Sequence, residues 1–94
     1  MHYTYILLSK KDNKLYVGYT KDLKLRFERH VNGKVLSTKY RRPVILVYYE
    51  ACVLEEDAIK REKYFKTHRG RMFLHNRLKS YFIETSQIKI KHEE

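Results

Sequence analysis

The first twenty residues have the pattern of a β-hairpin. Residues 3–9 are aromatic, β-branched or aliphatic until they reach a serine, which is typical of a strand. Residues 11–14 are polar and include Asp12 and Asn13, and both residue types tolerate the backbone angles of a tight turn. Strand-forming residues return at 15–19. We therefore expect two strands that pair through a short turn.

A first helix is predicted from Thr20, its expected N-cap, to about His30. Leu23 and Phe27 are four residues apart, so they lie on the same helical face and are expected to form its buried seam. The pair Asn32-Gly33 is typical of a helix end.

The rest of the chain predicts one more strand and two more helices. The apolar run at 44–50 indicates a third strand, central in its sheet or well covered. Helical periodicity extends over 54–66 and again over 71–82, with a break at 67–70. The basic stretch 34–43 ends in a proline and is expected to be a loop.

This β-β-α-β-α-α order predicts the α+β class, with a small three-stranded antiparallel sheet flanked by three helices. Ninety-four residues suffice for one domain, which we place at residues 1–83. Residues 84–94 form a polar tail with weak alternation at Ile88 and Ile90, which suits either a disordered end or an edge strand.

A formal net charge of +10 points to a polyanionic partner. Nucleic acid is favoured, because its phosphates bind cations through counterion release. A membrane is not expected, since no apolar run is long enough to cross a bilayer and no basic amphipathic helix has a clean apolar face. The single Cys52 cannot form an internal disulfide, which suits a reducing compartment, and we predict the cytoplasm.

Basic residues gather in two stretches, 21–42 and 60–79. A merely solvated basic surface is the plain alternative to a binding surface for either stretch. The candidates for phosphate contacts in DNA are Lys21, Lys24, Arg29, Lys39, Arg41, Arg42, Lys66 and Arg69.

Two tripeptides in the hairpin resemble the motifs that name the GIY-YIG nuclease family. Tyr16-Val17-Gly18 is close to the second motif, whereas Tyr3-Thr4-Tyr5 keeps only the tyrosine of the first. The chain also has Arg26 with His30 in the predicted first helix and Glu62 in the second, in the order typical of the family. The resemblance extends over nearly the whole chain and is strongest to small stand-alone members similar to the N-terminal nuclease domain of the DNA-repair excinuclease.

The resemblance implies a metal-dependent endonuclease that hydrolyses DNA phosphodiester bonds with one Mg²⁺ or Mn²⁺ ion. Tyr5 would be the general base, and Tyr16 would position water or the scissile phosphate. Arg26 would stabilise the developing negative charge, and His30 would assist binding or proton transfer. Glu62 would hold the ion.

Residue patterns give partial support that is independent of the resemblance. Tyr5 and Tyr16 can approach each other across paired strands, although tyrosines are also ordinary strand residues. Arg26 and His30 are one helical turn apart, which places them at the edge of the core or on a solvated helix edge.

Glu62 lies inside an apolar helical arc made by Leu54, Ala58, Ile59 and Phe65. A carboxylate on a buried face is costly unless it is paired or binds a metal ion. Its alternative to metal binding is an ion pair with Lys66, one turn later.

Two other classes of function suit the same sequence. One is a non-catalytic nucleic-acid-binding module that retains the nuclease fold, and the other is an adaptor whose basic surface binds an acidic protein. Neither the DNA structure that is cut nor the pathway follows from the sequence. So small a nuclease would suit a separate targeting protein.

Overall fold

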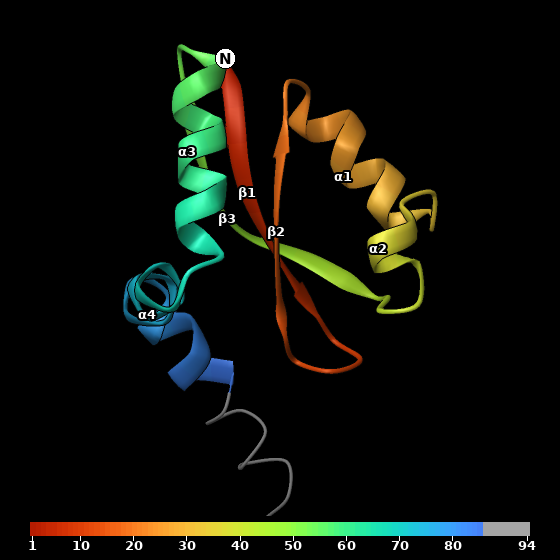
Figure 1. The fold of residues 1–94 in the computed structure, drawn as a ribbon. Coiled ribbons are helices and arrows are strands. Elements are labelled where there is room, and N and C mark those ends of the chain that lie inside the picture. Colours follow the sequence, from red (N-terminus) through yellow and green to blue (C-terminus); the bar gives the residue numbers. More distant parts are fainter. Residues whose placement is uncertain (86–94) are drawn as a thin grey trace, which may run out of the picture. The chain divides into compact units, whose positions relative to one another are not determined.

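The computed structural model describes residues 1–85, in which three antiparallel strands form one sheet (Figure 1). The strands are β1 (His2–Ser9), β2 (Leu15–Thr20) and β3 (Val44–Cys52), in the spatial order β2-β1-β3. Helices accompany this sheet in the expected order along the chain. The α+β class and the N-terminal hairpin are therefore confirmed.

β3 is an edge strand, so the prediction of a central or well-covered third strand was wrong. It pairs with β1 alone, and Ile45 and Tyr49 are exposed. The central position belongs to β1, which is buried from Thr4 to Ser9. An apolar run indicates a strand, but the connections between strands decide which one acquires two neighbours.

Side chains of β1 alternate between the two faces of the sheet. Tyr5 and Leu7 face α1 (Leu23–Val31), where Leu23 and Phe27 pack against them, so the predicted seam is confirmed as a half-buried contact. Thr4 faces the other way and donates a 2.6 Å hydrogen bond to the carbonyl of Ala58.

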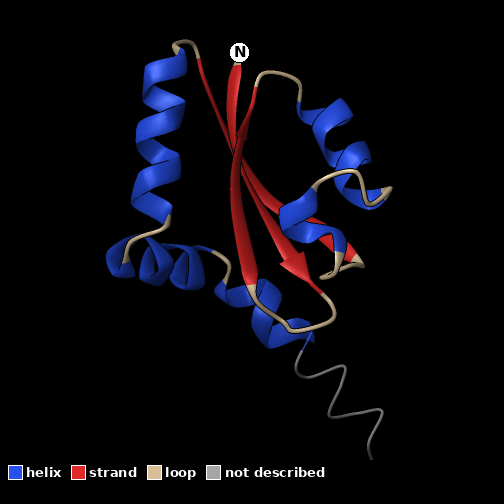
Figure 2. Cartoon of the chain, turned by 45° about the vertical axis from the view of Figure 1, so that its right-hand side comes forward, coloured by secondary structure: helices blue, strands red, loops and turns tan. Residues whose placement is uncertain are grey.

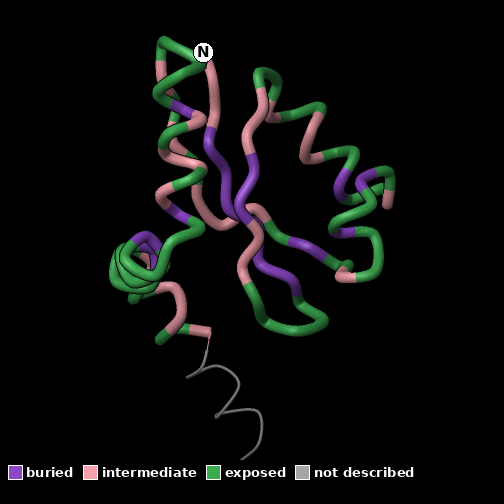
Figure 3. Tube along the Cα trace, in the orientation of Figure 1, coloured by how far each residue is buried: buried purple, intermediate pink, exposed green. Residues whose placement is uncertain are grey.

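Ala58 belongs to α3 (Glu55–Phe65), so α1 and α3 lie on opposite sides of the sheet, as Figures 1 and 2 show. The buried part of β1 runs between them (Figure 3).

α1 begins later than expected, because β2 continues through Thr20. The N-cap is Asp22, whose carboxylate accepts a hydrogen bond from the Leu25 backbone N–H at 3.1 Å. Thr20 instead accepts from the Asp22 backbone N–H at 3.1 Å. Asn32 is the C-cap, and Gly33 follows with a φ of 73°.

The stretch 34–43 is not only a loop, because it contains the one-turn helix α2 (Leu36–Lys39). Val35 and Thr38 are buried and hold this turn against the rest of the unit. A helix of four residues is too short to show a helical period in the sequence, which explains why it was missed.

The chain divides into two compact units, Met1–Tyr64 and a second unit that begins at Phe65. In the second unit, α4 (His68–Arg77) begins within the segment expected to be a break, since the Thr67 hydroxyl accepts a hydrogen bond from the Gly70 N–H at 3.1 Å and caps the helix.

Helical structure resumes at residues 79–85, so the predicted helix over 71–82 is two segments with different bounds. The predicted behaviour of the polar tail concerns mainly residues 86–94, which lie outside the described residues. Within residues 1–85, no helix has the length and apolar character needed to cross a bilayer.

One close approach in the hairpin fixes the position of Tyr5. Tyr5 on β1 lies opposite Gly18 on β2. A Cβ atom at residue 18 would lie only 2.3 Å from Tyr5 Cζ and 2.4 Å from its hydroxyl oxygen. The glycine of the Tyr16-Val17-Gly18 motif therefore gives space to the tyrosine ring that crosses it.

We predict that Gly18→Ala destabilises the protein by about 1–3 kcal/mol, because the added methyl overpacks a buried ring. Thermal or urea unfolding measures this loss. In a Tyr5→Val background the same substitution should cost much less, because the ring that clashes is absent. Equal losses in both backgrounds would contradict the proposed clash.

Candidate functional site

The candidate site is centred on the hydroxyl of Tyr5. Arg26 Nε donates a hydrogen bond to this hydroxyl at 3.3 Å, and His30 Nε2 lies 2.8 Å from it. Both partners come from successive turns of α1. The Tyr16 ring on β2 lies 6.4 Å from the Tyr5 ring and 5.3 Å from the His30 ring, between centroids. The four residues predicted to be catalytic thus lie together.

His30 is fully buried, so its expected position at the edge of the core was wrong, whereas Arg26 is half-buried as expected. Burial, together with the nearby positive charge of Arg26, lowers the pKa of His30 to about 4. His30 is therefore neutral at neutral pH and can accept a proton or a hydrogen bond through one ring nitrogen.

Thr38 completes the site from α2, because its hydroxyl lies 2.6 Å from His30 Nδ1. Arg26 can only donate, so the Tyr5 oxygen accepts that bond and its own hydrogen is left for His30 Nε2. His30 then has its hydrogen on Nδ1 and donates it to Thr38. Sequence reasoning missed Thr38 because it treated this stretch as a loop.

The two tyrosines differ in access to solvent. Tyr5 is only 1% exposed, and burial raises the pKa of its hydroxyl. Tyr16 is half-buried, and its hydroxyl accepts a hydrogen bond of 3.3 Å from Ser37 on α2. A solvent water or a phosphate therefore reaches Tyr16 more easily than Tyr5.

Arg26 connects both tyrosines electrostatically. Its hydrogen bond to Tyr5 raises the pKa of the guanidinium, and Tyr16 adds a smaller effect in the same direction. Arg26 therefore remains a fixed positive charge beside two hydroxyls. Such a charge favours a phenolate and can also bind a phosphate oxygen.

Glu62 lies on α3 and is half-buried. Burial is the main cause of the raised pKa of Tyr5, and the Glu62 charge is a smaller cause in the same direction, so this carboxylate acts on the site. The apolar arc around Glu62 is incomplete: Ala58 and Phe65 are buried, but Leu54 is 60% exposed and does not belong to it.

The donor set at Glu62 suits a hard divalent ion that keeps most of its water. Within the described residues, no group of three or more acidic, histidine or cysteine side chains could enclose a metal. Mg²⁺ commonly binds through one or two carboxylates, with water and substrate phosphates as its other ligands. A single carboxylate whose charge acts on the tyrosine site fits that arrangement.

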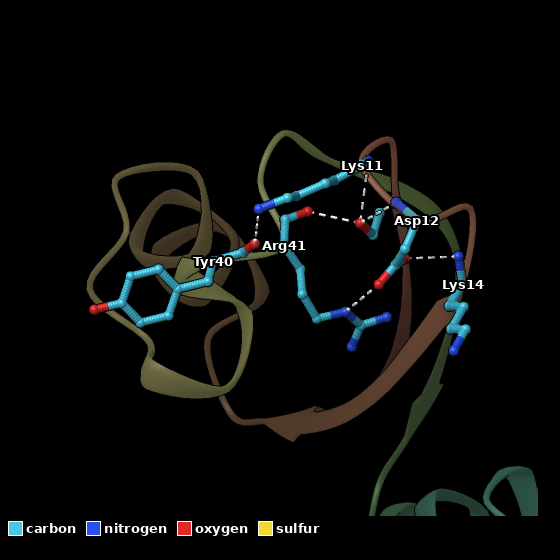
Figure 4. A network of polar contacts seen from close by, with 6 residues as sticks. Lys11, Asp12, Lys14, Tyr40 and Arg41 are labelled. Atoms are coloured by element: carbon cyan, nitrogen blue, oxygen red, sulfur yellow. Dashed lines mark hydrogen bonds and ion pairs between the residues drawn. The ribbon is translucent and has the colours of Figure 1, made fainter.

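The predicted DNA-binding cations are exposed in nearly every case. Arg41 is the exception, since it is half-buried and its Nε lies 3.2 Å from the Asp12 carboxylate, as Figure 4 shows. Lys66 and Arg69 belong to the second unit. The exposed members are Lys21, Lys24, Arg29, Lys39, Arg42, Lys66 and Arg69.

Comparison with known proteins shows relatives of similar size. A UPF0213 protein of Staphylococcus saprophyticus is 48% identical over 67 residues, which cover 70% of this chain and 80% of that protein. A UPF0213 protein of Staphylococcus epidermidis is 46% identical over 68 residues, covering 71% and 82%. These names state no activity.

The solution NMR structure of a UPF0213 protein from Bacillus halodurans superposes with a TM-score of 0.51 at 36% sequence identity, over 80% of this chain and 82% of that one. The model of the GIY-YIG catalytic domain matches residues 1–79, which include the two tyrosines, Arg26, His30 and Glu62. The chain therefore belongs to the GIY-YIG nuclease superfamily.

Proposed function

We propose that the protein is a metal-dependent endonuclease that hydrolyses phosphodiester bonds in DNA. The observation that best supports the proposal is that Arg26 and His30 both bond to the buried Tyr5 hydroxyl, with the Tyr16 ring beside them. The basic surface supplies the attraction for DNA, and the single Cys52 is compatible with a reducing cytoplasm.

In the proposed reaction, Tyr16 takes the proton of the attacking water. The water oxygen forms a new bond to phosphorus, the bond from phosphorus to the departing sugar oxygen breaks, and the departing oxygen takes a proton from solvent. Tyr16 can act as a base only as its phenolate, so it first releases its own proton to solvent, and the nearby positive charge of Arg26 stabilises the anion. Arg26 also donates to the phosphate oxygens as negative charge develops.

Tyr5 is a positioning residue in this proposal, rather than the general base that the family resemblance implied. Its side chain is only 1% exposed, and its hydroxyl holds Arg26 and His30 in place. Glu62 would hold one Mg²⁺ or Mn²⁺, and such an ion supplies charge neutralisation at the phosphate and the departing oxygen.

The first test uses the two tyrosines separately. Tyr16→Phe should reduce single-turnover nicking of a labelled DNA by about 10²–10⁴-fold, as for loss of a general base, with DNA binding unchanged. Tyr5→Phe should cost less activity but reduce stability by about 1–3 kcal/mol, because the buried His30 nitrogen loses its partner. The opposite order of activity loss would return the general-base role to Tyr5. Normal cutting by both variants would refute the mechanism.

The second test addresses the metal ion and the activity itself. Purified protein should nick members of a panel of duplex, flap, branched and single-stranded DNAs only with Mg²⁺ or Mn²⁺. Glu62→Gln keeps the shape but removes the charge that a hard cation needs, so cutting and Mn²⁺ binding measured by electron paramagnetic resonance should both disappear. Glu56→Gln, an exposed position on the same helix, is the matched control. Full activity of Glu62→Gln would exclude Glu62 as the ligand, and binding without cutting by the parent would favour a non-catalytic module.

The third test concerns Thr38. Thr38→Val keeps the shape but removes the hydroxyl that accepts the His30 Nδ1 hydrogen. Neutral His30 should then carry its hydrogen on Nε2, where it faces the hydrogen of the Tyr5 hydroxyl and their hydrogen bond is lost. We therefore expect a tenfold or larger loss of nicking and a loss of stability of about 1–3 kcal/mol. Thr38→Ser should restore both. Because a loss of folded protein also lowers activity, the rates are compared at temperatures where each variant is fully folded, and an active Thr38→Val would contradict the role.

A further inference from the structure

A basic hollow of about 470 Å³ lies outside the tyrosine site. Its lining includes Lys11 from the hairpin turn, Lys39 from the end of α2, and the neighbouring Tyr40 and Arg42. Three of these four side chains are cations. The proposed reaction uses none of them.

The positive charge in this hollow is not neutralised by acidic residues. Within residues 1–85, none of the three cations forms an ion pair with a carboxylate. Asp12, beside Lys11 in sequence, pairs with Arg41 instead. Lys11 Nζ donates to the backbone carbonyl of Tyr40 at 3.1 Å (Figure 4), a bond that positions the ammonium without cancelling its charge.

The Arg42 guanidinium is fixed in the hollow before any ligand binds. Its Nε donates to the Lys39 carbonyl at 3.1 Å and its Nη1 to the Val31 carbonyl at 3.3 Å, which leaves Nη2 for another acceptor. It also lies close over Gly33, where a Cβ atom would be 2.7 Å from Arg42 Cζ. Preorganised donors of this kind bind anions at a low entropic cost.

Tyr40 adds an aromatic surface to this charge. Its side chain is 70% exposed, and Lys39 Nζ lies 5.5 Å from the ring centroid. Figure 4 shows the ring pointing away from the hydrogen bonds that tie its backbone to the hairpin. An exposed aromatic ring beside fixed cations is the combination that stacks a nucleobase and binds its phosphate.

We propose that this hollow binds an unpaired nucleotide of the DNA strand next to the cleavage site. The phosphate would contact Arg42, Lys11 and Lys39, and the base would stack on Tyr40. The proposal rests on the proposed nuclease function and specifies its substrate class as DNA with single-stranded nucleotides beside the cut. A base inside a duplex is already stacked on its neighbours and cannot offer its face to Tyr40.

α2 joins the hollow to the tyrosine site. Ser37 and Thr38 bond to Tyr16 and His30, whereas the next two residues, Lys39 and Tyr40, line the hollow. The Cα atoms of Thr38 and Tyr40 are at most about 7.6 Å apart, because each step along the chain spans about 3.8 Å. The hollow and the tyrosine site are therefore neighbours, as the proposal requires of a nucleotide next to the cleavage site.

Binding of labelled DNA to the Glu62→Gln protein without metal tests this inference apart from catalysis. Tyr40→Ala should weaken binding of a single-stranded oligonucleotide about tenfold and leave binding of a blunt duplex of the same sequence unchanged, while Tyr40→Phe should bind like the parent. Tyr49→Ala, at another exposed tyrosine on β3, is the matched control and should have no effect.

The charges are tested by Lys11→Ala and Lys39→Ala, each of which should make single-strand binding less dependent on salt concentration. Equal weakening of single-stranded and duplex DNA by Tyr40→Ala, or no weakening, would overturn the inference. If the parent protein cuts no DNA but Tyr40→Ala still weakens only single-strand binding, the nuclease proposal is refuted and the nucleotide pocket is retained.

Discussion

The hydrogen bond between the buried Tyr5 hydroxyl and His30 is the interaction on which the rest of the site depends. It joins the central strand to α1 at 2.8 Å, and Arg26 of the same helix donates to the same oxygen. The ring can reach this position only because residue 18 has no side chain. A buried polar group of this kind is costly when it lacks a partner. The central strand, α1 and Gly18 must therefore all be correctly placed for the bond to form.

Electrostatics sets the protonation states around this bond. Burial and the charge of Arg26 lower the pKa of His30 to about 4, so the imidazole is neutral. A neutral ring can bridge two hydroxyls, those of Tyr5 and Thr38, because one nitrogen accepts and the other donates. The positive charge of the site therefore remains on Arg26, where a phosphate would need it, instead of being shared with a second cation in the core.

The one-turn helix α2 has an importance out of proportion to its length. Its Ser37 hydroxyl contacts Tyr16 and its Thr38 hydroxyl contacts His30. Its last residue, Lys39, lines the basic hollow. The turn is held by buried Val35 and by the ties between the hairpin and residues 40–43, including the Ser9 hydroxyl that donates to the Arg41 carbonyl at 2.7 Å. The hairpin turn thus supports the site from a distance, through the backbone of a neighbouring segment.

The sequence by itself determined the three strands, the order of the longer elements and four of the residues that gather at the site, since periodicity and short motifs are local properties. Tyr5, Tyr16, Arg26 and His30 could be named because their order in the chain resembles a known family. Only the tertiary structure decided that β3 lies at the edge, that His30 is fully buried, and that Tyr5 is less accessible than Tyr16. It also revealed Thr38, which lies in a turn too short to leave a period in the sequence. Burial and hydrogen-bond partners arise from segments distant in the chain, so no local pattern could predict them.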